Sequence, residues 1–254
     1  MKLREPVAQV FGKERAVLYE AEVEQLAESN HSKRDLVDFL ETYAAPMGVF
    51  YTLSMLKRSG MSIKDLKEAL GFLFDPARTI TKMLRASLPV GSRILDFGCG
   101  VGQLTCALAL RGFQTYGVDI SEDALRTASK LASKLNCRAA FYLAKKNKLP
   151  FPDEHFDAVL SFWVFHEVRK DKLPYVIEEL HRTVRRNGQA FIIDQEGIAK
   201  FENIKSLMKH YGFKFHSEKT LSPAYDHGKS SRAIVLAFTR KQQKSTGLSS
   251  SVSA

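Results

Sequence analysis

From residue 92 onward, short apolar segments alternate with amphipathic ones, and this alternation limits the fold more than any other feature of the chain. The apolar segments predict strands at 93–97, 114–118, 139–143, 156–162 and 189–194. Apolar residues at helical spacing predict the intervening helices at 103–111, 121–135, 172–185 and 201–211. Such alternation is typical of a parallel sheet covered by helices. Two last strands, 213–219 and 233–239, have no helical pattern between them and predict a closing antiparallel pair.

Residues 1–88 have a different, all-helical pattern. We expect helices at 16–29, 35–45, 49–58, 62–70 and 77–86. Residues 53–84 have the outline of a helix-turn-helix, which leaves a DNA-binding element open as an alternative. We interpret 1–88 as a helical cap or dimerisation region, since no wing-like hairpin follows. We expect the main domain at 89–240, and the Ser-rich residues 241–254 as a disordered tail.

Composition limits the remaining possibilities. With 254 residues, 44% of them hydrophobic, the chain suits one α/β domain with an appendage. Its three cysteines, Cys99, Cys106 and Cys137, form neither a C-x-x-C pair nor a zinc-ligand spacing, so we expect no metal. The longest uncharged stretch, 42–56, is shorter than the ~20 apolar residues of a membrane span. The amino terminus lacks a signal-peptide core, so we expect a cytoplasmic protein.

The positive charge is concentrated in the second part of the chain. The formal net charge is +10, and residues 91–254 carry 25 basic against 16 acidic side chains. A polyanionic partner and a solvated lysine-rich face both account for such an excess.

The first predicted strand runs into a glycine-rich turn, Asp96-Phe97-Gly98-Cys99-Gly100-Val101-Gly102. Ligands of open parallel sheets bind outside the carboxyl ends of the strands, and glycines let the backbone approach a ligand closely. A dinucleotide fingerprint, G-x-G-x-x-G/A, fails here because its third glycine position is Gln103. A nicotinamide enzyme is therefore the weaker alternative, and a ligand without phosphates fits the spacing better.

Asp119 ends the second predicted strand, seventeen residues after Gly102. A carboxylate at this place can accept hydrogen bonds from both hydroxyls of a ribose. The alternative is that Asp119 caps the helix that begins near Ser121. With the glycine turn upstream, we favour ribose binding.

Four segments together resemble successive motifs of the class I S-adenosylmethionine-dependent methyltransferases. They are Ile94-Leu95-Asp96-Phe97-Gly98-Cys99-Gly100-Val101-Gly102, Gly117-Val118-Asp119, Leu149-Pro150-Phe151-Pro152-Asp153-Glu154-His155-Phe156-Asp157 and Leu180-His181-Arg182-Thr183-Val184-Arg185-Arg186-Asn187-Gly188. The resemblance covers roughly 92–239 and is closest to the type 11 small-molecule group, to which ubiquinone and menaquinone C-methyltransferases are also similar.

The resemblance implies a fold, a cofactor and a set of site residues. The fold is a Rossmann-like seven-stranded sheet of order 3-2-1-4-5-7-6 whose last strand is antiparallel. The cofactor is S-adenosyl-L-methionine. The implied cofactor-binding residues are Asp96, Gly98, Cys99, Gly100, Gly102, Asp119, Ile120, Lys145 and Phe162.

One position departs from the family pattern. After the third strand the family usually has Gly-Asp-Ala, whereas this chain has Ala144-Lys145-Lys146. Lysine cannot accept the hydrogen bond that an aspartate accepts from the adenine amino group. Backbone groups or Asn147 then read the adenine, or the loop has shifted; alternatively Lys145 and Lys146 attract an anionic substrate.

The loop after the fourth strand, 161–168, lies beside the sulfonium in this fold. His166 is our candidate for the catalytic base, because its ordinary pKa is near neutrality; a helix-start or packing role is the alternative. We expect Trp163 and Phe165 to line the pocket. Asp194, Gln195 and Glu196, after the fifth strand, are candidates for the acceptor end.

The predicted function is methyl transfer to a small-molecule acceptor at oxygen, carbon, sulfur or a nitrogen other than an exocyclic amino group. The chain lacks the Asn/Asp-Pro-Pro-Tyr/Phe sequence of enzymes that methylate such amino groups. One alternative is an RNA methyltransferase, because residues 197–254 hold 10 basic against 3 acidic side chains. The residues that would extend that surface are Arg182, Arg185, Arg186, Lys145 and Lys146. Another is a DNA-binding regulator acting through 53–84. A homodimer is compatible with all of these.

Overall fold

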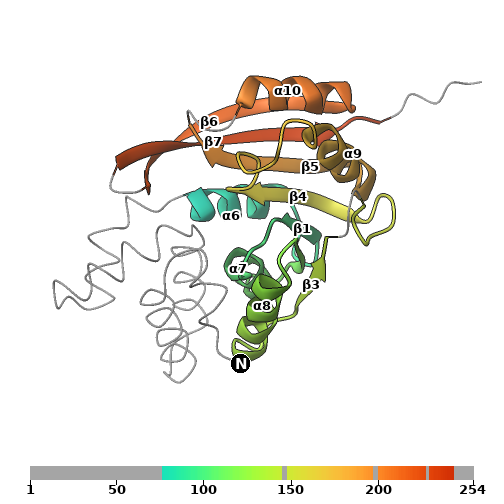
Figure 1. The fold of residues 1–254 in the computed structure, drawn as a ribbon. Coiled ribbons are helices and arrows are strands. Elements are labelled where there is room, and N and C mark those ends of the chain that lie inside the picture. The colour runs from blue at the N-terminus through green and yellow to red at the C-terminus, as the bar shows by residue number, and fades with distance from the viewer. Residues whose placement is uncertain (1–75, 145–147, 197–199, 227–228, 243–254) are drawn as a thin grey trace, which may run out of the picture.

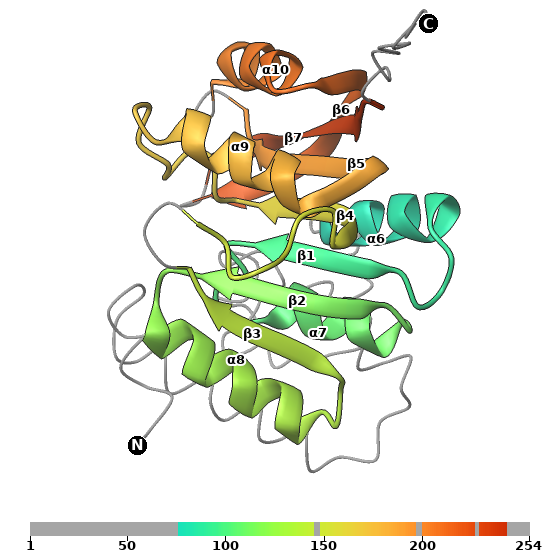
Figure 2. The same ribbon diagram turned by 90° about the vertical axis from the view of Figure 1, so that its right-hand side faces the viewer.

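The computed structural model describes residues 76–144, 148–196, 200–226 and 229–242. These residues form one seven-stranded sheet of order β3-β2-β1-β4-β5-β7-β6 (Figures 1 and 2). Its strands are β1 (Arg93–Phe97), β2 (Gln114–Asp119), β3 (Ala139–Leu143), β4 (Phe156–Phe162), β5 (Val184–Gln195), β6 (Phe213–Asp226) and β7 (Lys229–Arg240). The described helices are α6 (Pro76–Ser87), α7 (Gln103–Leu110), α8 (Glu122–Lys134), α9 (Leu173–Thr183) and α10 (Phe201–His210). The predicted fold and strand order are confirmed.

Strands β1 to β5 pair in parallel, whereas β7 runs antiparallel to both β5 and β6. At one end of the sheet α8 contacts β3, and at the other end α10 contacts β6 (Figure 1). This layout follows from the sequence, because parallel neighbours need a crossover helix while antiparallel ones need only a short connection.

Two apolar cores cover the two faces of the sheet. One core joins the strands to α6 and α7; α6 contributes Ile80 and Leu84, and Leu88, directly after the helix, continues their spacing of four residues. The other core joins them to α9 and α10 through residues such as Ile177 and Met208. Both faces of the central strands are therefore buried, as is usual for a parallel sheet.

The sheet reverses its strand order between β1 and β4. The chain runs from β1 outward through β2 to β3 and then returns to β4, which pairs with β1 on its other side. Phe97, the last residue of β1, lies opposite both Val118 of β2 and Ser161 of β4. Ligands of such sheets bind in the crevice outside the carboxyl ends of the strands at this reversal. The turn after β1 and the loop after β4 both start there.

Two predictions of element bounds were wrong. The helix expected at 172–185 ends earlier than predicted, and the two strands of the closing hairpin are longer than predicted. Helix α9 ends at Thr183, not at 185, and β5 already begins at Val184. Val184 pairs with Phe156, and the register then shifts so that Gln189 pairs with Ala158. Asn187, with a φ of 58°, lies in the extra segment and makes the turn that this shift requires. The strands of the closing hairpin, β6 and β7, are also longer than the predicted 213–219 and 233–239.

The helical cap expected at 1–88 and the tail expected at 241–254 lie almost wholly outside the described residues; α6 is the predicted helix 77–86. None of the helices in the described ranges combines the length and apolarity that a bilayer span requires.

Candidate functional site

The glycine turn after β1 is tied to β2 and packed against the loop after β4. The backbone N–H groups of Gly98 and Cys99 both donate to the carbonyl oxygen of Val118, at 2.8 and 3.0 Å. Gly98 has a φ of +76°, and a Cβ there would overlap the side chain of Val164. Gly100 has a φ of +52°, but a Cβ there would meet no atom within 4 Å. Glycine is thus needed at Gly98 for packing, while Gly100 faces open space that a ligand can enter.

Asp119 joins the tip of β2 to the glycine turn. Its Oδ2 accepts a hydrogen bond from the N–H of Gly100 at 2.9 Å, and its Oδ1 accepts one from the N–H of Ser121 at 2.9 Å. Helix α8 is capped by Ser121, whose Oγ accepts from the N–H of Ala124. The alternative that Asp119 is the cap is therefore wrong. Each carboxylate oxygen keeps a free lone pair, as two ribose hydroxyls would require.

Asp96 lies beneath the turn. Its side chain is buried, and its Oδ2 accepts a hydrogen bond of 2.6 Å from the hydroxyl of Thr105 in α7. Burial raises the pKa of Asp96 to about 7; the bond from Thr105 lowers it and the nearby charge of Asp119 raises it further. With a pKa near neutrality, the carboxyl group would shift toward its charged form if a cation bound beside it. Sequence reasoning missed Thr105, because a threonine inside a helix carries no motif signal.

The other predicted cofactor residues lie in different surroundings. Ile120, directly after Asp119, is 84% exposed at the tip of β2. Cys99 is half-buried, and burial raises the pKa of its thiol. Gly102 has a φ of +79°, and a Cβ there would lie 2.7 Å from the Cβ of Ala128. Phe162 is a buried member of the core beneath α6 and α7.

Lys145, Lys146 and Asn147 lie outside the described residues. The chain that leads to them is nevertheless attached to the crevice, since the N–H of Ala144 donates to the carbonyl oxygen of Asp119 at 2.8 Å.

His166, the predicted base, is bound to Asp194 at two points. Its backbone N–H donates to Asp194 Oδ2 at 3.0 Å, and its Nδ1 lies 2.7 Å from Asp194 Oδ1. Since a carboxylate only accepts, Nδ1 carries the proton in the neutral form of the ring, and Nε2 is then the basic nitrogen. Nε2 lies 3.2 Å from Oε1 of Glu167, whose side chain is 79% exposed.

The surroundings of His166 favour its charged form. The hydrogen bond to Asp194 raises the pKa of His166, burial opposes this, and the charges of Asp194 and Glu167 raise it further. The side chain of Asp194 is completely buried. A histidine oriented by a buried carboxylate is the arrangement that proteins use for proton transfer. Sequence reasoning selected both residues but did not pair them, because they lie on different elements.

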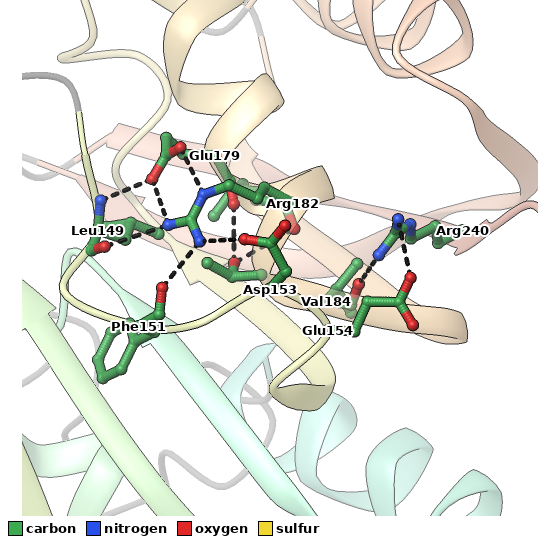
Figure 3. Close-up of polar contacts among 10 residues, drawn as sticks. Leu149, Phe151, Asp153, Glu154, Glu179, Arg182, Val184 and Arg240 are labelled. Atoms are coloured by element: carbon green, nitrogen blue, oxygen red, sulfur yellow. Dashed lines mark hydrogen bonds and ion pairs between the residues drawn. The ribbon is translucent and has the colours of Figure 1, made fainter.

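The side chain of Arg182, in α9, forms hydrogen bonds with the segment that precedes β4 (Figure 3). Its guanidinium donates to both carboxylate oxygens of Glu179, to Asp153 and to the carbonyl oxygens of Phe151 and Leu149. The N–H of Leu149 also donates to Glu179, at 2.7 Å. Arg182 is thus engaged within the protein.

The two neighbouring arginines are paired as well. Arg185 binds Asp157 at 2.6 Å and Arg186 binds Glu154 at 3.0 Å. Each of the three arginines that the RNA alternative names thus has a carboxylate partner, and these contacts neither support nor exclude that alternative. Within the described ranges no group of three His, Cys, Asp or Glu is placed to hold a metal ion.

The strand order, the glycine turn on β1 and the acidic tip of β2 agree with the fold and the motifs that the resemblance to class I S-adenosylmethionine-dependent methyltransferases implied. Residues 94–188 match the family model described as "Methyltransferase domain". Over these residues the chain is therefore similar to a methyltransferase domain, as the sequence motifs predicted.

Named relatives show which methyltransferases this chain is similar to. An uncharacterised methyltransferase of Synechocystis is 33% identical over 105 residues, 41% of this chain and 47% of the relative. The demethylmenaquinone methyltransferase of Symbiobacterium thermophilum is 31% identical over 109 residues, 41% and 43% of the two chains. The ubiquinone/menaquinone biosynthesis C-methyltransferase of Burkholderia mallei is 28% identical over 134 residues, 51% and 53%. The resemblance to ubiquinone and menaquinone C-methyltransferases is confirmed, although the chain spans about half the length of these relatives.

Solved structures share the fold. A TehB-like methyltransferase from Corynebacterium glutamicum superposes with a TM-score of 0.54 at 21% identity, covering 78% of this chain and all of that one (100%). A methyltransferase from Methanosarcina mazei gives 0.58 at 16% identity, covering 63% and 98%.

Proposed function

We propose that this protein transfers a methyl group from S-adenosyl-L-methionine to a small-molecule acceptor that gives up a proton to His166. One observation carries the cofactor part of the proposal: the carboxylate of Asp119 binds Gly100 and Ser121 at the crevice where the strand order reverses. This arrangement holds a carboxylate rigidly at the place where a ribose is bound in such sheets.

The residues present fit this cofactor. Asp119 has lone pairs left for the two ribose hydroxyls, and Gly100 leaves open space for the amino-acid end. The buried carboxyl group of Asp96 lies where it can balance a cationic ligand. Ile120 offers an exposed apolar side chain for the adenine ring. When bound, S-adenosylmethionine supplies an electrophilic methyl group; the chain supplies alignment and proton removal.

The acceptor is a molecule with an acidic proton. His166 is held by Asp194 with Nε2 as its basic nitrogen, which suits a hydroxyl group or a ring carbon activated by one. The names of two relatives, a demethylmenaquinone methyltransferase and a C-methyltransferase of ubiquinone/menaquinone biosynthesis, support an aromatic hydroxyl compound. We also place the protein in the cytoplasm, since all three of its cysteines are free thiols.

Calorimetry tests the cofactor proposal. We expect the full chain to bind S-adenosylmethionine and not NAD. Asp119→Ala should weaken binding at least about tenfold, because two charge-assisted hydrogen bonds are lost. Glu122→Ala, which removes an exposed carboxylate three residues further on, is the matched control and should stay within about twofold. Equal affinities for Asp119→Ala and the unsubstituted protein would place the ribose elsewhere.

Labelling tests the acceptor proposal. The protein is incubated with isotopically labelled methyl donor and, separately, with a metabolite extract and with total RNA. We expect label in the small-molecule fraction, retained at elevated salt. Label in RNA that falls steeply as salt rises would support the RNA alternative instead.

A further inference from the structure

Trp163 breaks the alternation of β4. Ala158, Leu160 and Phe162 belong to the core beneath α6 and α7, whereas Val159 belongs to the core on the opposite face. By alternation, Trp163 would share the face of Val159. Instead it packs against the core beneath α6 and α7, and its ring meets that of Phe162 edge-on at 5.9 Å. Its φ of +59° accounts for this change of face.

This backbone conformation is held in place despite its cost. A left-handed φ is unfavourable for a residue with a bulky side chain and persists only where its surroundings enforce it. The N–H of Trp163 donates to the carbonyl oxygen of Ile193 in β5 at 2.9 Å. The next residue, Val164, packs against Gly98 of the glycine turn. The backbone at Trp163 and Val164 is therefore held between the glycine turn and the end of β5.

The indole nitrogen of Trp163 is buried and has no hydrogen-bond partner among the described parts of the chain. Leaving a buried donor unpaired costs free energy, and native proteins seldom do so. Backbone strain and an unpaired donor thus meet at one residue, directly after β4 and three positions before His166. Strain of this kind gathers at sites that contact a ligand.

We propose that the indole N–H of Trp163 donates a hydrogen bond to an oxygen of the methyl acceptor, which makes Trp163 a specificity-determining residue. This inference rests on the function proposed above. An indole nitrogen is a donor only, so the ligand atom has to be a hydroxyl, phenolate or carbonyl oxygen. A site built to bind an oxygen rejects an analogue that lacks it, because the donor is then left unpaired.

A matched pair of ligands tests the proposal. 1-Naphthol carries a hydroxyl group on its aromatic ring, and 1-methylnaphthalene has a methyl group in place of that hydroxyl. Trp163 is the single tryptophan of the chain, so the ¹⁵N-labelled full-length protein gives one indole N–H signal. With S-adenosylhomocysteine present at saturation, we expect 1-naphthol to move the indole proton downfield. We expect 1-methylnaphthalene to leave it nearly unchanged.

Trp163→Phe removes the donor and keeps an aromatic ring. Calorimetry should show a roughly 2- to 12-fold loss of 1-naphthol affinity, the range for one neutral hydrogen bond. The affinity for 1-methylnaphthalene should change less than about twofold. Thermal unfolding checks that the variant is folded, and the indole signal is read in the unsubstituted protein, so that arm does not depend on the variant.

Three results would overturn the proposal. They are failure of 1-naphthol to bind, binding without movement of the indole signal, and an equal loss of affinity for both ligands in Trp163→Phe. A complete shift of the signal with S-adenosylhomocysteine alone would assign the donor to the cofactor and overturn it as well. Failure of the proposed function is seen separately, as absence of heat on titration with S-adenosylhomocysteine.

Discussion

One carboxylate fixes both the backbone and the ring of the candidate base: Asp194 accepts from the N–H of His166 at 3.0 Å and lies 2.7 Å from its Nδ1. Because Asp194 lies at the end of β5 and His166 in the loop after β4, the pair connects two neighbouring strand ends. The two contacts determine which way the imidazole faces and which nitrogen is basic. The site thus has an oriented imidazole, the proposed base, on the β4 side and a fixed carboxylate, Asp119, on the β2 side.

Replacing Asp194 by asparagine should disable this base. The amide can present an N–H to Nδ1, which favours the wrong tautomer and removes the basic nitrogen from the acceptor. We expect the rate of labelled methyl transfer to fall by about 10²-fold or more. His166→Gln should lose a similar amount, and the double variant should lose little beyond either single one, since the two residues act as a unit. Glu178→Gln, at an exposed position of α9, is the control and should retain most of the activity.

The pH dependence of the rate follows from the raised pKa of His166. The base works only in its neutral form, so the rate should rise with pH and level off above a pKa that is higher than the ordinary 6.5. Asp194→Asn removes the main cause of the shift and should move the rise of its residual activity to lower pH. A pH–rate profile of the two proteins measures this. A rise at the same pH in both proteins would assign the titration to another group.

Much of the fold can be predicted from local pattern, because apolar runs bounded by glycine or polar residues mark strands. The strands 93–97, 139–143 and 156–162 agree with the structure at both ends. The early start of β5 at Val184 was missed, since that residue continues the helical pattern of α9 and becomes a strand only by pairing with Phe156. The strand order followed from resemblance and not from pattern.

The candidate site was predictable only in part. Asp96 and Asp119 were identified by their place at the end of a strand, close to glycines. The pairing of His166 with Asp194, 28 residues apart, depends on which strands are neighbours, and local spacing does not reveal it. The conformation of Trp163 was likewise hidden, because nothing in its neighbours requires a left-handed φ.

Substitution by alanine should have different effects on stability at two glycines of the glycine turn. At Gly98 a Cβ would overlap Val164, and the φ is +76°, so Gly98→Ala should lower the free energy of unfolding by about 2 kcal/mol or more. Val164→Ala in the same chain should restore part of this loss. Gly100→Ala meets open space and should cost only about 1–2 kcal/mol while weakening cofactor binding. Denaturant unfolding and calorimetry separate the two effects; equal losses of stability would contradict the packing argument.

Arg182 should contribute to stability through its hydrogen bonds to residues 149–153. Arg182→Met leaves two carbonyl oxygens without this donor and Glu179 with only the N–H of Leu149, and we expect a loss of about 2–4 kcal/mol. Lysine should not restore it, because it lacks the planar fork of donors. Arg186→Met, which removes a half-exposed ion pair with Glu154, should cost less than about 1 kcal/mol. Urea unfolding compares the three variants, and similar values for Arg182→Met and Arg186→Met would rule out this contribution.

Asp96 should couple both stability and cofactor binding to pH. Its pKa rises from 3.8 to about 7 in the folded protein, so the folded state binds a proton that the unfolded chain has released. Stability should therefore fall as pH rises from about 4 to 7, by an amount on the order of 4 kcal/mol or less. Asp96→Asn should flatten that fall and keep the protein more stable than the parent above pH 7.

A cationic ligand favours the charged carboxylate, so affinity for S-adenosylmethionine should increase between pH 6 and 8 in the parent and stay constant in Asp96→Asn. Urea unfolding and calorimetry across this range decide the point, and an affinity that is independent of pH in both proteins would show that Asp96 does not sense the ligand.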